Sequence, residues 1–160
     1  AVTVLPSLTS SKIKTIEFFD KHYEEAVAGS SVSITLEDEI NVTRGDILVK
    51  SDEVPQSSKT LKAAVCWMDG KVLVPGAKYE IQHNSNRILA KIDSIEGIIA
   101  TDYSGEDTSK NQLSLNEIGK VNFKLSKNLF YDNYADNKAG GSFILIDTQS
   151  NTTAGVGFIG

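Results

Sequence analysis

The sequence contains few of the residues that mark special classes of chain. Its 160 residues include one cysteine, Cys66, three prolines, one methionine and two histidines. A single cysteine excludes an internal disulfide framework and suits the reducing cytoplasm. No apolar run approaches the ~20 residues of a membrane-spanning helix, and the opening Ala-Val-Thr-Val-Leu-Pro resembles no signal peptide. We therefore expect a cytoplasmic globular protein with no membrane partner and, because Met is absent at position 1, a piece of a longer chain.

Positive charge is also scarce, and the imbalance is local. The chain has 16 basic and 21 acidic residues, a net charge of −5. Residues 1–54 hold 5 of the basic and 10 of the acidic residues, so residues 55–160 are neutral. Because such a surface repels phosphate backbones, no nucleic-acid partner is expected. The acidic residues form either solvated turns or a patch that faces a basic partner.

Short alternating runs rich in Val, Ile, Thr and Phe predict β-strands throughout the chain. Turn residues bound the runs, a pattern typical of all-β sandwiches and barrels. Only Glu24–Val27 and Leu113–Ile118 could form a helical turn, the latter with Ser114 capping against Glu117, and Asp102–Gln112 is a polar loop. The expected strands are Val2–Leu5, Lys12–Phe19, Ser31–Leu36, Asp46–Lys50, Thr60–Met68, Lys78–His83, Arg87–Ile95, Lys120–Leu125, Ser142–Asp147 and Thr152–Ile159.

A polar segment, Ser51–Lys59, separates the acidic from the neutral part and predicts a domain boundary near Pro55. Residues 55–160 then hold about six strands, enough to close a small barrel. Residues 1–54 hold about four strands, which would leave unpaired sheet edges that stable proteins cover. We expect residues 1–54 to be a partial barrel that lacks its opening strands.

Motifs for chemistry are missing. A phosphate-binding loop needs Gly-Lys followed by Ser or Thr, but Val follows both Gly70-Lys71 and Gly119-Lys120. Gly155–Gly160 spells a dinucleotide fingerprint, but no helix can follow it here, so it is interpreted as a strand with small residues at tight packing points. No catalytic, cofactor-binding or metal-binding residue is predicted.

The histidines and the cysteine show no ligand spacing either. His22 and His83 lie near polar turns and are expected to be exposed. Cys66 falls in an apolar run and is expected to be a buried small hydrophobic residue.

Three parts of the chain carry a family resemblance. They are Glu25–Val49, Leu115–Val121, and Gly141–Asp147 together with Asn151–Ile159. These parts resemble domains II and III of elongation-factor-Tu-like GTPases and, within them, the large-subunit family of bacterial sulfate adenylyltransferases. Leu36-Glu-Asp-Glu-Ile40 followed by Arg44-Gly-Asp46 is typical of that branch.

The resemblance implies two small antiparallel β-barrels of the translation-factor type, residues 1–54 being a domain II-like barrel truncated at its N-terminus and residues 55–160 a domain III-like barrel. It implies a heterodimeric parent enzyme that converts ATP and sulfate to adenosine 5′-phosphosulfate. The small subunit, which binds ATP, is the catalyst, and the large subunit hydrolyses GTP. GTP and Mg²⁺ would bind a GTPase domain that is absent here, so the piece itself is not expected to be catalytic or to hold a cofactor.

The implied role is docking, so the candidate site is an interface. The residues expected to contact the GTPase domain or the small subunit are Glu37, Asp38, Glu39, Arg44 and Asp46. The alternative is a pair of solvated turns in which Arg44 bridges a local carboxylate. The nearby apolar residues Leu36, Ile40, Ile47 and Val49 are expected in the core of the first domain, and Trp67 and Phe143 in that of the second.

Two other functions stay open. The chain could be the tRNA- or ribosome-binding domains of a translation-type GTPase, although its negative charge argues against tRNA. It could also be a barrel that binds a small ligand in its mouth.

Overall fold

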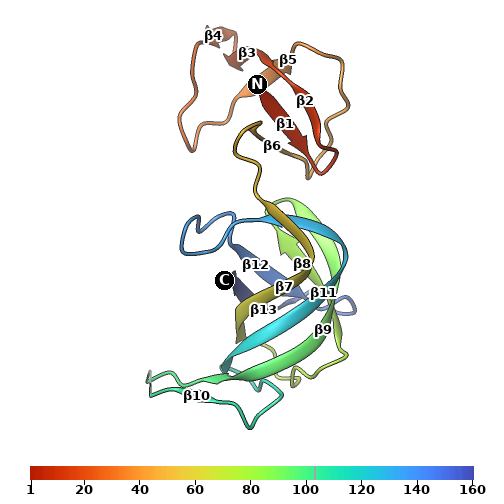
Figure 1. The fold of residues 1–160 in the computed structure, drawn as a ribbon, viewed down its shortest axis with the longest axis vertical. Coiled ribbons are helices and arrows are strands. Elements are labelled where there is room, and N and C mark those ends of the chain that lie inside the picture. The colour runs from red at the N-terminus through yellow and green to blue at the C-terminus, as the bar shows by residue number, and fades with distance from the viewer. Residues whose placement is uncertain (103) are drawn as a thin grey trace. The chain divides into compact units, whose positions relative to one another are not determined.

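The computed structural model describes residues 1–102 and 104–160, and every regular element among them is a β-strand. The predicted all-β fold is therefore confirmed. The segments Glu24–Val27 and Leu113–Ile118 form no helical turn, since segments this short cannot offset the cost of starting a helix. No described helix is long and apolar enough to cross a membrane. The chain divides into two compact units, residues 1–54 and 55–160 (Figure 1).

The first unit contains two three-stranded antiparallel sheets. The sheet β2-β1-β6 is built from β1 (Val2–Leu5), β2 (Thr9–Ser11) and β6 (Ile47–Lys50). The sheet β4-β3-β5 is built from β3 (Ile13–Phe18), β4 (Lys21–Tyr23) and β5 (Ser33–Leu36). The sequence pattern missed β2 and β4, because three mostly polar residues carry too little periodicity to predict a strand.

The buried hydrophobic side chains of the first unit lie on β1, the central strand of its sheet, where Val4 and Leu5 are each 1% exposed. The residues predicted as its core are only half-buried: Leu36, Ile40, Ile47 and Val49. That prediction was wrong because these residues lie on the outer strands β5 and β6 or in the segment after β5. An outer strand has a neighbour on one side only, so its side chains keep more contact with solvent.

The second unit is a closed antiparallel barrel (Figure 1). Six strands follow the order β9-β11-β7-β13-β12-β8, and β8 pairs with β9 to close the circle. The short strand β10 pairs with the end of β9, inside the segment predicted as a loop; residue 103 of that segment lies outside the described residues. The bounds are β7 (Gln56–Trp67), β8 (Lys78–His83), β9 (Asn86–Ile99), β10 (Glu106–Asp107), β11 (Ile118–Tyr131), β12 (Ser142–Ile146) and β13 (Thr153–Ile159).

The strands β7, β9 and β11 are longer than the sequence predicts. Gln56 at the start of β7 pairs with Tyr131 at the end of β11, so the second half of the predicted linker belongs to the barrel. The register between β11 and β7 shifts between Lys124 and Leu129. Such irregularities bend a long strand around a barrel, and here the bend breaks the alternation on which the prediction relied.

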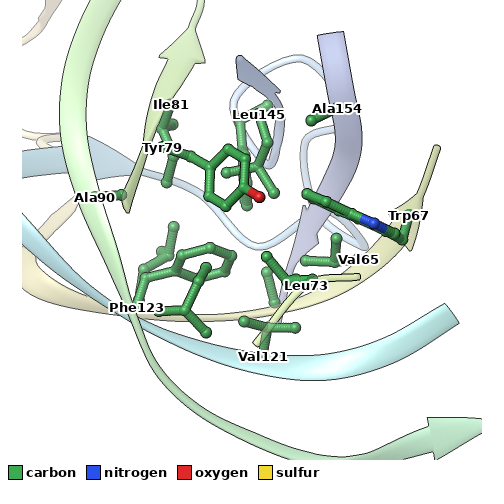
Figure 2. Packing of buried hydrophobic residues seen from close by; sticks show 14 of the residues in the cluster. Val65, Trp67, Leu73, Tyr79, Ile81, Ala90, Val121, Phe123, Leu145 and Ala154 are labelled. Atoms are coloured by element: carbon green, nitrogen blue, oxygen red, sulfur yellow. The ribbon is translucent and has the colours of Figure 1, made fainter. Parts of the chain in front are cut away.

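The barrel interior is filled with side chains (Figure 2). Trp67, Tyr79 and Phe123 point into it and are at most 2% exposed. The Trp67 and Tyr79 rings meet edge to face with centroids 5.3 Å apart, and Phe123 meets Phe143 in the same way at 5.6 Å. The core positions predicted for Trp67 and Phe143 are confirmed. Side chains occupy the interior of the barrel, which argues against the hypothesis of a ligand in the barrel mouth.

Candidate functional site

The first predicted interface turn follows β5 and contains Glu37, Asp38 and Glu39. The Asp38 carboxylate accepts a hydrogen bond from the Ser11 hydroxyl at 2.8 Å, and the Asp38 N–H donates to the same hydroxyl at 3.3 Å. The Glu37 N–H donates to the Lys12 carbonyl at 2.9 Å, and the Glu37 carboxylate lies 4.0 Å from the Lys12 ammonium. Because Ser11 is buried, these bonds attach the turn firmly to the end of β2.

The second predicted turn, Arg44–Asp46, comes directly before β6, and Thr43 precedes it. The Asp46 N–H donates to the Thr43 carbonyl at 3.0 Å and closes the turn. The Asp46 carboxylate accepts from the Thr43 N–H at 2.8 Å. Gly45 is buried with φ +103°, a conformation in which a side chain would be strained. The Arg-Gly-Asp sequence therefore builds a structural turn.

These contacts divide the five candidate residues. The carboxylates of Asp38 and Asp46 are used within their own turns, and Glu37 is weakly paired with Lys12. Glu39 and Arg44 are exposed, and across residues 1–102 and 104–160 no hydrogen bond or ion pair holds either side chain. The alternative in which Arg44 bridges a local carboxylate is therefore not what the structure shows. Glu39 and Arg44 are the charges left available to a partner.

Of the two histidines, one differs from its prediction. His22 is exposed as expected and lies 3.5 Å from the Glu17 carboxylate. His83 is 1% exposed, with Nε2 2.8 Å from the Gly140 carbonyl oxygen, to which it donates. Its burial has a sequence signal that the prediction missed, because Tyr79, Ile81 and His83 alternate along β8 on the inward face.

Cys66 is half-buried rather than buried. On β7 it lies between the inward-facing Val65 and Trp67, so alternation places its side chain on the outer face. No cluster of His, Cys, Asp and Glu among the described residues could hold a metal ion.

The first unit contains an apolar hollow of about 570 Å³ that was not predicted from the sequence. Two aromatic side chains, Phe18 at the end of β3 and Tyr23 at the end of β4, form one side of it. The loop between β4 and β5 forms the rest with Glu25, Ala26, Val27, Gly29, Ser30, Ser31 and Val32. Two aromatic residues flanking a hairpin turn were the available signal, but their side of the sheet depends on the strand register.

Four carboxylates of the second unit have lowered pKa values: Glu96, Asp102, Asp107 and Asp147. The Asn122 amide and the Lys62 ammonium bond the Glu96 carboxylate and lower its pKa from 4.5. Backbone N–H groups of Ser150 and Gln149 bond the Asp147 carboxylate and lower its pKa from 3.8. In each case the contacts favour the charged form in the folded protein.

We expect acid to weaken the second unit through these carboxylates, Glu96 and Asp147 among them. A carboxylate with a lowered folded pKa stabilises the fold fully above its unfolded pKa, and that contribution is lost as pH falls through the folded pKa. The free energy of unfolding should be steady from about pH 7 to about pH 5 and should fall between about pH 4.5 and pH 2. Urea unfolding followed by Trp67 fluorescence measures it. Asp147→Asn should reduce the slope of that fall, and an unchanged slope would contradict the assignment to Asp147.

The comparisons with known proteins agree with this architecture. Residues 60–160 match the family described as GTP-eEF1A C-terminal domain-like. The chain belongs to this family. Solved structures of sup35, complexed with GMPPNP or with GDP, superpose on 99% of the chain with TM-scores of 0.88 and 0.87. At 14% identity these likenesses show the fold alone, and that fold is of the translation-factor type predicted from the sequence.

Curated relatives are closer in sequence. The chain is 40% identical over 158 residues to sulfate adenylyltransferase subunit 1 of Colwellia psychrerythraea and 39% identical to that of Psychromonas ingrahamii. It is 35% identical to the bifunctional enzyme CysN/CysC of Rhodopirellula baltica. Each match covers 99% of the chain, but only 34%, 34% and 24% of the respective relative. The chain thus spans about a third or less of the length of these relatives.

Proposed function

We propose that the chain is part of the GTP-hydrolysing large subunit of a cytoplasmic sulfate adenylyltransferase. The observation that supports this most is the similarity over 99% of the chain to proteins named sulfate adenylyltransferase subunit 1. In that assembly a small subunit transfers the adenylyl group of ATP to sulfate, and GTP and Mg²⁺ bind a GTPase domain outside the present chain. The chain itself serves domain docking, coupling to GTP hydrolysis and subunit assembly.

The structure supports a docking role for residues 1–54, the proposed domain II-like partial barrel. The sheet β4-β3-β5 leaves apolar side chains exposed, including Ile13 on its central strand β3 and Ile34 on its outer strand β5, each at 38%. Surfaces of this kind mark contacts with other protein segments. The barrel of residues 55–160, the proposed domain III-like unit, has a filled interior and offers its outer surface instead. The translation-factor alternative is not favoured, because the curated relatives reported above are enzymes of sulfate activation.

Titration of the chain against the small subunit from the same genome tests the proposal. The titration is run by isothermal calorimetry, with and without the separate GTPase domain. Saturable one-to-one binding in either arm supports it; binding only with the GTPase domain present assigns the chain to coupling. No binding in either arm, together with tight binding of aminoacyl-tRNA, would overturn it in favour of the translation-factor alternative.

Reversing the two available charges should weaken this binding. Glu39→Lys and Arg44→Glu are each expected to lower affinity by about threefold to tenfold, mainly through slower association at low salt. Asp52→Lys is the matched control, since Asp52 is an exposed acid of the same unit that was not predicted at the interface. Unchanged melting temperatures are expected because neither side chain holds a turn together. Equal effects of Glu39→Lys and Asp52→Lys, with an effect of opposite sign for Arg44→Glu, would indicate net charge alone and would remove Glu39 and Arg44 as contacts.

A further inference from the structure

The sheet β4-β3-β5 has one apolar and one polar face. Ile16 on β3 lies opposite Tyr23 on β4 and opposite Ile34 on β5, so the three side chains share a face. Phe18, two residues further along β3, projects from the same face. The reverse face carries polar residues, including Glu17 and its cross-strand partner His22.

The apolar face is not covered by the rest of the first unit. Phe18 is 43% exposed, Tyr23 is 46% exposed and Val27 in the adjoining loop is 71% exposed. Together they border the apolar hollow of about 570 Å³ defined above. A volume of this size can hold one large apolar side chain with its backbone.

Phe19, beside the hollow, has two unfavourable properties, a strained backbone conformation and an exposed aromatic ring. It lies in the two-residue hairpin turn between β3 and β4 with φ +52°, a conformation that bulky residues avoid and that Gly or Asn would adopt without strain. Its side chain is 86% exposed and meets the Phe18 ring edge to face at 4.7 Å. The strained φ and the exposed ring are both unfavourable for folding, although the contact with Phe18 is favourable, and a residue of this kind is typical of a recognition surface.

The charges around the hollow are acidic. The hairpin turn carries Asp20, Lys21 follows as the first residue of β4, and the adjoining loop begins with Glu24 and Glu25. Glu25 lines the hollow itself. In the part of the chain that the structure describes, Asp20, Glu24 and Glu25 make no ion pair or side-chain hydrogen bond. These carboxylates favour a positively charged occupant.

We propose that the apolar hollow binds a basic polypeptide segment of another protein. The segment inserts an aromatic or long aliphatic side chain between Phe18, Tyr23 and Val27, rests on the Phe19 ring, and places Lys or Arg side chains against Asp20, Glu24 and Glu25. Nucleic acid does not suit the site because its phosphates would meet carboxylates. A second copy of the chain does not suit it either, since a two-fold contact would bring two acidic rims together.

Synthetic peptides provide the probe. The test peptide is Lys-Arg-Lys-Leu-Phe-Leu-Lys-Arg; one partner peptide has Asp at every basic position, and the other has Ser at every apolar position. Each is titrated into the chain and followed by amide chemical shifts in NMR. The test peptide should shift the signals of residues 18–32 in a saturable way and bind at least about tenfold more tightly than either partner peptide. Raising the salt concentration from about 0.1 M to about 1 M should weaken the binding of the test peptide, because ions screen the carboxylates around the hollow.

Variants separate binding from folding. Val27→Asp should weaken the test peptide at least about tenfold, whereas Val42→Asp, at another exposed valine of the same unit, should not. Glu25→Lys should weaken it more than the control Asp52→Lys. Phe19→Asn should weaken binding while leaving the melting temperature of the unit unchanged or higher, since Asn relieves the strained φ.

Several outcomes would overturn the inference. They are equal binding of the acidic peptide, shifts that map outside residues 18–32, and equal losses for Val27→Asp and Val42→Asp. Saturable binding of oligouridylate RNA at residues 18–32 in place of the peptide would also overturn it. The inference is independent of the sulfate adenylyltransferase assignment, because the peptide titration needs no small subunit.

Discussion

Replacing Trp67 by Ala is expected to lower the free energy of unfolding of the barrel by about 3–5 kcal/mol. Trp67 is fully buried, and its ring meets Tyr79 edge to face at 5.3 Å. Its indole Nε1 donates a 2.7 Å hydrogen bond to the Lys71 carbonyl, which would lose this partner. Removing the ring also leaves a cavity that the closed barrel cannot easily collapse.

The free energy of unfolding of this variant is measured by calorimetry and circular dichroism, because Trp67 is the only tryptophan and its fluorescence is lost. Trp67→Phe keeps most of the ring contacts but loses the hydrogen bond, so its destabilisation should be intermediate. Leu89→Ala is the matched control: Leu89 lies on β9 of the same barrel, is 56% exposed, and should change stability by no more than about 0.5 kcal/mol. A loss below about 1 kcal/mol for Trp67→Ala would show that the core around it can repack.

The strands that the sequence predicts well are those that alternate strictly. Lys78–His83 was predicted with both ends as observed in β8, because every second residue faces a filled interior. The same periodicity predicts nothing beyond a bulge, so β11 was expected to end at Leu125 although it continues to Tyr131. Barrel closure through the pairing of β8 with β9 is a long-range property that no local pattern contains.

Burial in the first unit shows a second limit. Alternation correctly separates apolar from polar positions, but it does not say how much protein covers the apolar side. Ile47 and Val49 have apolar positions on β6, yet an outer strand of a three-stranded sheet leaves them half-buried. For the same reason the sequence did not predict the apolar hollow: Phe18 and Tyr23 both line it only because the hairpin register places them on one face.

The candidate interface was predictable as a pair of charged turns but not as individual contacts. The sequence shows Asp38 and Asp46 as equivalent to Glu39. The structure separates them, because Ser11 and Thr43 bond the two Asp carboxylates and leave Glu39 unpartnered among the described residues. Some polar side chains of a turn form hydrogen bonds to the turn itself or to its neighbours, and the backbone geometry decides which side chains these are.

Replacing Gly157 by Ala should destabilise the barrel by about 2–3 kcal/mol. Gly157 on β13 lies directly opposite Phe143 on β12, and a Cβ atom added there would overlap the Phe143 ring. That ring is 3% exposed and also meets Phe123 edge to face, so it has no free space into which to turn. The interpretation of Gly155–Gly160 as a strand with small residues at tight packing points predicts this cost. Urea unfolding followed by Trp67 fluorescence measures it.

A double-mutant cycle assigns the cost to this one contact. Phe143→Leu shortens the side chain that the new methyl group meets, so the Gly157→Ala, Phe143→Leu double variant should be more stable than the sum of the single losses predicts, by about 0.5–3 kcal/mol. Gly70→Ala is the matched glycine control, because a Cβ atom at Gly70 meets nothing within 4 Å. Strict additivity would contradict the proposed overlap. The loss of stability would then come from the backbone of β13, and Gly157 would be needed for the hydrogen bonds between strands rather than for space beside the Phe143 ring.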